Sequence, residues 1–125
     1  MLGEKDVQAT VAVKSLDAAK RFYEGALGLK RTGGNETGAL LYKCGSATLL
    51  VYESQFAGTN KATAATWVIR EGIEGFVEAL KKKGVAFEHY DYPGVTREGD
   101  LHTMAGVKAA WFKDPDGNIL ALVDQ

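Results

Sequence analysis

The chain has 125 residues, of which 46% are hydrophobic and 25% charged, and its formal net charge is −1 at pH 7. This composition is typical of a soluble globular protein, and the near-neutral charge gives no basis for binding nucleic acid or an anionic membrane. The single cysteine, Cys44, excludes an internal disulfide and a cysteine-based zinc cluster. The first ten residues show no secretory pattern and no apolar run is long enough to span a membrane, so we expect a cytoplasmic protein.

The first half of the chain predicts a strand, a helix and three further strands. Residues 7–13, VQATVAV, are rich in β-branched side chains and predict the first strand. Ser15 is a plausible helix N-cap, apolar residues follow at helical spacing, and Gly28 is well placed to end the helix. Short strands are then expected over residues 29–32, 39–43 and 47–52.

The second half repeats this order. A strand is expected over residues 63–69 and a helix from Ile73 to the lysines before Gly84. Strands over residues 85–90, 108–113 and 119–124 complete the unit, with a long loop over residues 92–106. The sequence therefore predicts a single α+β domain of two tandem βαβββ units, residues 1–54 and 62–125, joined by a linker over residues 55–61. Neither unit could bury a sheet face alone.

Two motifs, RFYEGALGLK (residues 21–30) and AAWFKDPDGNIL (residues 109–120), resemble the vicinal oxygen chelate superfamily. It is also called the glyoxalase/bleomycin-resistance/extradiol-dioxygenase superfamily. The resemblance covers nearly the whole chain and implies a curled mixed sheet around a pocket, usually in a homodimer. It also implies that many members hold a divalent metal through the first and last strands of each unit.

Alignment to these motifs places the four metal-ligand positions at Gln8, Leu49, Ala65 and Ala121. Only Gln8 carries a donor atom, whereas a catalytic zinc usually takes about three protein ligands. We therefore expect neither a metal nor another cofactor, and a divalent metal stays as the alternative.

The two histidines, His89 and His102, lack the spacing of a metal-binding pair. His102 falls in the long loop, where functional groups often lie, and imidazole titrates near neutral pH. His102 is therefore the candidate catalytic acid or base.

Strand alternation predicts which side chains face the pocket. Small residues on the expected inner face leave room for a ligand, although they also fit close packing. Large aromatic rings beside them suit a planar or apolar compound. The predicted ligand-binding residues are Gln8, Thr10, Tyr42, Leu49, Val51, Ala65, Trp67, Ile69, Tyr90, Trp111 and Ala121.

Three functions fit these features. The first is a metal-independent binding protein that sequesters a small apolar or aromatic molecule, as in the bleomycin-resistance branch. The second is a lyase, isomerase or dioxygenase that depends on a metal or on His102. The third is an accessory domain acting through protein partners. The sequence shows no exposed apolar stripe that would support this function.

Overall fold

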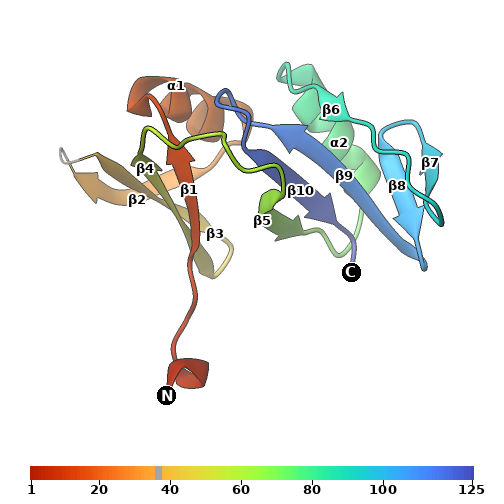
Figure 1. Cartoon of the computed structure of the whole chain (residues 1–125), viewed down its shortest axis with the longest axis horizontal. Coiled ribbons are helices and arrows are strands. Elements are labelled where there is room, and N and C mark those ends of the chain that lie inside the picture. Colours follow the sequence, from red (N-terminus) through yellow and green to blue (C-terminus); the bar gives the residue numbers. More distant parts are fainter. Residues whose placement is uncertain (36–37) are drawn as a thin grey trace.

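The structure, a computed structural model, describes residues 1–35 and 38–125. It contains two modules that follow one another along the chain (Figure 1). After a 3-10 turn, η1 (Leu2–Glu4), the N-terminal module comprises β1 (Ala9–Val13), α1 (Leu16–Lys20), the π-helical η2 (Arg21–Ala26), β2 (Lys30–Asn35), β3 (Ala39–Cys44) and β4 (Ala47–Glu53). The C-terminal module comprises β5 (Thr63–Val68), α2 (Ile73–Lys82), β6 (Phe87–Glu88), β7 (Thr96–Glu98), β8 (Leu101–Met104), β9 (Val107–Lys113) and β10 (Ile119–Val123).

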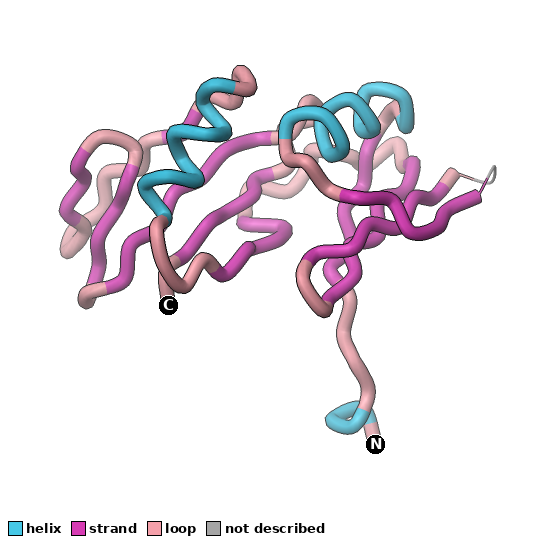
Figure 2. The backbone as a smooth tube through the Cα atoms, turned by 180° about the vertical axis from the view of Figure 1, so that it is seen from behind, coloured by secondary structure: helices cyan, strands magenta, loops and turns pink. Residues whose placement is uncertain are grey.

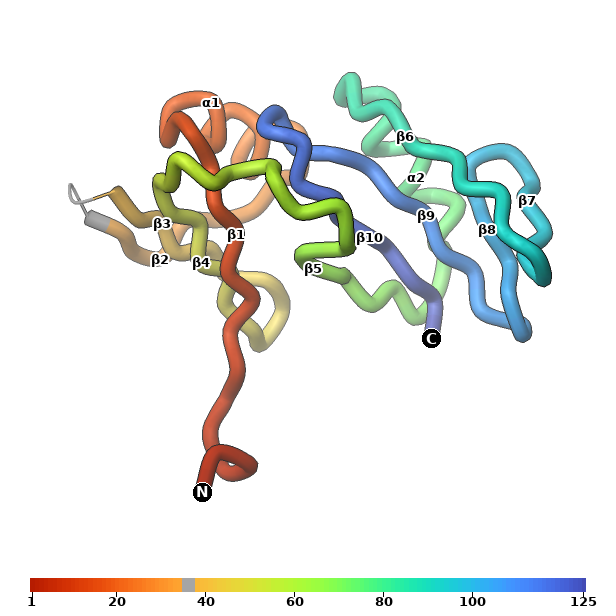
Figure 3. Tube along the Cα trace, viewed as in Figure 1, coloured from red at the N-terminus to blue at the C-terminus, as the bar shows by residue number. Residues whose placement is uncertain are grey.

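Each module builds one mixed sheet. The strand order is β1-β4-β3-β2 in the first sheet and β5-β10-β9-β8-β7 in the second, where β6 also pairs with β9. In both, the outer pair is parallel, β1 with β4 and β5 with β10. The edge strands β1 and β5 contact each other (Figure 3), and the described strands do not close into a barrel. The predicted α+β fold with two repeated units is confirmed.

The predicted helix ends are also confirmed. Ser15 Oγ accepts a hydrogen bond from the Ala18 N–H at 3.3 Å, so Ser15 caps α1. Gly28 and Gly84 have φ angles of 71° and 90°, the left-handed conformation that ends helices. In the described part of the chain, neither helix has the length and apolarity that crossing a bilayer requires.

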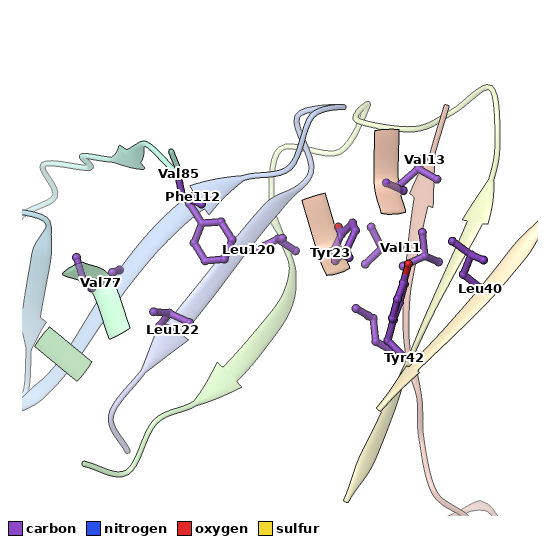
Figure 4. Packing of buried hydrophobic residues seen from close by; sticks show 14 of the residues in the cluster. Val11, Val13, Tyr23, Leu40, Tyr42, Val77, Val85, Phe112, Leu120 and Leu122 are labelled. Carbon is purple, nitrogen blue, oxygen red and sulfur yellow. The ribbon is translucent and has the colours of Figure 1, made fainter. Parts of the chain in front are cut away.

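The helices cover one face of each sheet, and the core lies beneath them. α2 lies across the C-terminal sheet (Figure 2). The buried side chains form one cluster that runs through both modules (Figure 4). It includes Val11, Val13, Tyr23, Leu40 and Tyr42 of the N-terminal module, and Val77, Val85, Phe112, Leu120 and Leu122 of the C-terminal module. The side of each sheet that faces its helix is called the helix side below, and the opposite side the open face.

The predicted loop over residues 92–106 is wrong in part. It contains a hairpin of β7 and β8, in which Glu98 pairs with Leu101 around Gly99 and Asp100. Gly99 has a φ of 63°, which a glycine adopts without strain. His102 therefore lies on a strand and is only 3% exposed, rather than in a loop over the pocket.

The turn over residues 114–118, called the Asp114 turn, joins the two modules. Asp114 Oδ2 accepts hydrogen bonds from the Tyr23 hydroxyl and the Asn118 amide, both at 2.8 Å. Its Oδ1 accepts from the backbone N–H groups of Asp116 and Asn118 at 3.0 and 2.9 Å. The Asn118 amide also donates to the Ala12 carbonyl of β1 at 2.7 Å. The two sequence motifs thus meet in one buried network that connects the modules.

Candidate functional site

Strand pairing decides which predicted site residues reach the open face. On β1, Val11 and Val13 are buried under α1, so Thr10 and Ala12 take the open face, as predicted. On β10, Leu120 and Leu122 belong to the core, so Ala121 takes the open face. Trp111 pairs with Ala121 and shares that face, whereas Phe112 is in the core, which confirms the predicted parity of β9.

The predicted face is wrong for Leu49, Val51 and Tyr42. Val51 pairs with Val11 of β1, and paired residues point to the same side of a sheet. All three residues are at most 2% exposed and belong to the core beneath α1. The Tyr42 hydroxyl donates to Glu24 Oε2 at 2.9 Å, and burial together with this bond raises the pKa of Tyr42.

The predicted face is also wrong for Ala65, Trp67 and Ile69. Ala65 pairs with Leu120, and Trp67 pairs with Leu122. These three side chains pack against the core from the helix side. The open face of β5 instead carries Thr66, which pairs with Ala121.

The two errors arise from two separate differences in length between the modules. Four residues separate Lys43 from its partner Thr48, whereas five separate Lys113 from its partner Ile119. Aligning the turn glycines therefore shifts β4 by one residue against β10. Counted from the equivalent residues Thr10 and Thr66, the helix begins six residues later in the first module and seven residues later in the second. A slip of one residue moves a side chain to the other face.

The register places Thr10, Leu50, Thr66 and Ala121 at equivalent open-face positions, in place of the set aligned from the motifs. This corrected set offers two hydroxyl groups and two hydrocarbon side chains. Divalent metals in proteins take mainly carboxylate, imidazole and thiolate ligands. The described residues also include no group of three or more His, Cys, Asp or Glu side chains that could hold a metal. The donor set does not fit the metal that the fold family implies.

Three aromatic side chains gather on the open face of the C-terminal sheet: Tyr90, His102 and Trp111, called the aromatic cluster below. The His102 and Trp111 rings meet edge to face with centroids 4.9 Å apart, and Tyr90 meets Trp111 at 5.4 Å. Trp111 Nε1 donates to Thr63 Oγ1 at 3.2 Å, which fixes the indole across β10. Thr63 is a cluster contact that reasoning from the sequence missed.

Two polar atoms of the aromatic cluster are buried without a hydrogen-bond partner in the described structure. They are the Tyr90 hydroxyl and His102 Nδ1. His102 Nε2 accepts the Tyr90 backbone N–H at 2.8 Å, so in the neutral ring the proton sits on Nδ1. Burial raises the pKa of Tyr90, with a further contribution from Glu88. The cluster therefore presents two unused donors, and a buried donor without a partner costs free energy.

A charged group flanks the aromatic cluster. Asp100 Oδ1 lies 2.7 Å from His89 Nε2, and its Oδ2 lies 2.9 Å from Lys81 Nζ. The bond from His89 and then that from Lys81 hold the pKa of Asp100 below its usual range. His89 itself is exposed, and its ring centroid lies 6.5 Å from that of His102.

The structure thus brings together Tyr90, His102, Trp111 and Ala121. It leaves Gln8 and Thr10 exposed on the N-terminal module, with β5 and β10 between β1 and β9. Whether any of these residues binds a ligand stays a prediction.

No curated protein sequence matches the chain. The glyoxalase family protein from Enterococcus faecalis has a similar structure, with 23% identity over 98% of this chain and 99% of that one and a TM-score of 0.73. A bleomycin resistance determinant encoded on the transposon Tn5 is 18% identical over 97% and 98%, with a TM-score of 0.72. Lactoylglutathione lyase from Agrobacterium tumefaciens is 17% identical over 94% and 91%, with a TM-score of 0.69.

These similarities to solved structures concern the fold alone. Family membership is shown by the sequence. The family model matches residues 7–122, which include both motifs, the aromatic cluster and every strand of both modules except the last residue of β10. The chain belongs to the Glyoxalase/Bleomycin resistance protein/Dioxygenase superfamily.

Proposed function

We propose that this protein is a cytoplasmic, metal-independent binding protein that sequesters a small apolar or aromatic compound at the aromatic cluster. The observation that carries this proposal is the pair of unpartnered donors beside an indole ring. Ring faces offer stacking to a planar ligand, and the Tyr90 hydroxyl and His102 Nδ1 offer two hydrogen bonds to orient it. The poor fit of the donor set to a metal supports binding without one.

We further propose that a second copy of the chain completes the pocket, in a homodimer. The open faces carry three exposed apolar side chains, Tyr52, Val68 and Met104, which are 38%, 46% and 58% exposed. They lie on β4, β5 and β8, on strand positions that face away from the helices. Exposed apolar side chains on a sheet face are typical of an interface. A facing copy would shield both these residues and a bound ligand from water.

Tryptophan fluorescence tests the binding site directly. Bleomycin and a panel of planar aromatic compounds are titrated into the wild type and into Trp111→Phe, with Trp67→Phe as the matched control on the helix side. We expect saturable quenching that Trp111→Phe abolishes and Trp67→Phe retains. Quenching that persists unchanged in Trp111→Phe would place the ligand elsewhere.

Metal content tests the other half of the proposal. Elemental analysis of the purified protein, before and after chelation, is expected to show no stoichiometric divalent metal and no change in ligand affinity. A bound metal whose removal abolishes binding or turnover would contradict metal independence.

A His102-assisted enzyme is the second candidate, because the free Nδ1–H of His102 could donate a proton or hydrogen bond to a reacting oxygen. Since one relative is named a lactoylglutathione lyase, lactoylglutathione is the first substrate to assay. Turnover that His102→Asn abolishes, in protein that still binds aromatic probes, would favour this candidate over sequestration.

A further inference from the structure

A cavity lies between the modules on the helix side, away from the aromatic cluster. It is a groove with a volume of about 700 Å³, within the range of small-molecule sites. Its apolar lining includes Trp67, Leu80, Phe112 and Leu122 from the C-terminal module and Leu27 from the N-terminal module. It is called the helix-side groove below. Because it draws residues from both modules, it is a property of the joined chain rather than of either repeat.

Three lysines line this groove, and no acidic residue of the described chain does. Lys30 and Lys43 lie directly opposite each other on β2 and β3. Lys83 approaches from the end of α2. Like charges directly opposite each other in a sheet are unfavourable, so the pair of Lys30 and Lys43 lowers the stability of the unliganded protein.

Three other lysines of the C-terminal module have carboxylate partners, whereas Lys82 has none among the described residues. Lys81 pairs with Asp100, Lys108 with Glu74, and Lys113 with Glu88. Within residues 1–35 and 38–125, no carboxylate lies within ion-pair distance of the ammonium groups of Lys30, Lys43 and Lys83. The positive charge at the helix-side groove is therefore not neutralised by the part of the chain that the structure describes.

We propose that the helix-side groove binds a small amphipathic carboxylate, with its apolar body against Trp67 and its carboxylate head among Lys30, Lys43 and Lys83. An apolar floor favours a hydrocarbon or aromatic body, because burial removes its surface from water. An anionic head relieves the repulsion between Lys30 and Lys43 and gains attraction from Lys83. This site is independent of the proposed function, since its lining shares no residue with the aromatic cluster.

The two tryptophans distinguish the two sites. Trp67 lines the helix-side groove, and Trp111 lies on the open face. The probe is dodecanoate brominated near the middle of its chain, because bromine quenches only indoles that it nearly touches. We expect saturable quenching in Trp111→Phe, where Trp67 is the remaining indole, and little quenching in Trp67→Phe.

Cys44 gives a second readout that needs no tryptophan substitution. The thiol lines the same groove and is half-buried. Burial raises the pKa of Cys44, and a hydrogen bond with Trp67 opposes this shift. Saturating unbrominated dodecanoate is expected to slow alkylation of Cys44 in the wild type, measured by mass spectrometry.

Charge variants test the carboxylate. Lys43→Gln combined with Lys83→Gln is expected to weaken dodecanoate binding about fivefold, since partly exposed ion pairs are individually weak. Lys61→Gln, in the exposed linker, is the matched control and should leave the affinity unchanged. Added salt should weaken binding to the wild type, and 1-dodecanol should bind less tightly than dodecanoate.

Each contrary result overturns the inference in its own way. Quenching of Trp111 alone would put the ligand on the open face, in favour of the proposed function and against this site. Equal affinity for dodecanol, or for the double lysine variant, would leave an apolar groove without anion recognition. Failure to protect Cys44 and to quench Trp67 at saturating probe would show that the groove binds no such compound, whatever the aromatic probes do at Trp111.

Discussion

The hydroxyl groups of Tyr23 and Tyr90 are both buried, but in the described structure only the Tyr23 hydroxyl has a hydrogen-bond partner. Tyr23 donates to Asp114 at 2.8 Å inside a network whose polar atoms are satisfied and which ties α1–η2 to the Asp114 turn. Among the described residues, the Tyr90 hydroxyl has no hydrogen-bond partner, and His102 Nδ1 beside it has none either. A satisfied buried network serves stability, whereas the two donors without a partner are the groups that the proposed binding site would use.

The largest expected effect concerns Asp114. Asp114→Ala removes the acceptor of four hydrogen bonds and leaves buried N–H and O–H groups without partners. We expect a loss of about 3 kcal/mol or more in the free energy of unfolding, measured by urea denaturation. Asp114→Asn should cost less, because its amide oxygen still accepts. A loss under about 1 kcal/mol for Asp114→Ala would show that the modules are held by apolar contacts alone.

Gly58 is expected to give the next effect. It has a φ of 71°, and a Cβ added there would collide with the Asp116 carbonyl oxygen of the Asp114 turn. Gly58→Ala should cost about 2 kcal/mol or more, from backbone strain and displacement of the turn. Gly45→Ala is the matched control, since Gly45 has a φ of 61° with no atom within 4 Å of such a Cβ. Equal losses at the two glycines would mean that the linker does not press on the turn.

The two tyrosines test the comparison itself. Tyr23→Phe leaves one lone pair of Asp114 unused and should destabilise the protein by about 1 to 2 kcal/mol. Tyr90→Phe removes a donor that has no partner in the described structure, so it should be neutral or slightly stabilising in the absence of ligand. Its effect should appear instead as weaker binding of aromatic probes. Comparable destabilisation by both substitutions, in paired urea curves, would show that the Tyr90 hydroxyl has a partner in solution.

The smallest expected effect is a pH dependence at Asp100. The pKa of this carboxyl is lowered by the bonds from His89 and Lys81, so the folded state holds the charged form more strongly than the unfolded state. Its contribution to stability is therefore present above its ordinary pKa of 3.8 and is lost as the pH falls through the lowered value. Asp100→Asn should be less stable than the wild type at neutral pH and approach it in acid. A difference independent of pH would assign Asp100 no electrostatic role.

Reasoning from the sequence reached the fold because the signals for it are local. β-branched residues predict β1, Ser15 predicts the start of α1, and the pair of motifs predicts the repeat. The Asp114 turn illustrates the limit of such reasoning. Its residues read as an ordinary tight turn, and only the folded chain brings Tyr23 to its carboxylate.

Half of the candidate site was misplaced for a definite physical reason. Strand faces alternate with every residue, so one extra residue in the Asp114 turn, and one before α2, put Leu49 and Ala65 on the wrong face. The β7–β8 hairpin had a readable signal, a two-residue Gly-Asp turn within alternating residues, that the loop assignment overlooked. The contact from Trp111 to Thr63 had no signal in the sequence, because the two residues meet across a strand.

Two strands, β6 and β8, pair side by side along the same edge of β9. β6 pairs with residues 111–112 of β9, and β8 pairs with residues 107–109, where the first module has the single strand β2 along β3. His102 therefore reaches the cluster on a segment that has no counterpart in the other repeat. Because this segment attaches at a rim and contributes little to the buried interior, evolution or an engineer could exchange it for another hairpin. Such a graft would change the side chains beside Trp111 while leaving the duplicated scaffold intact.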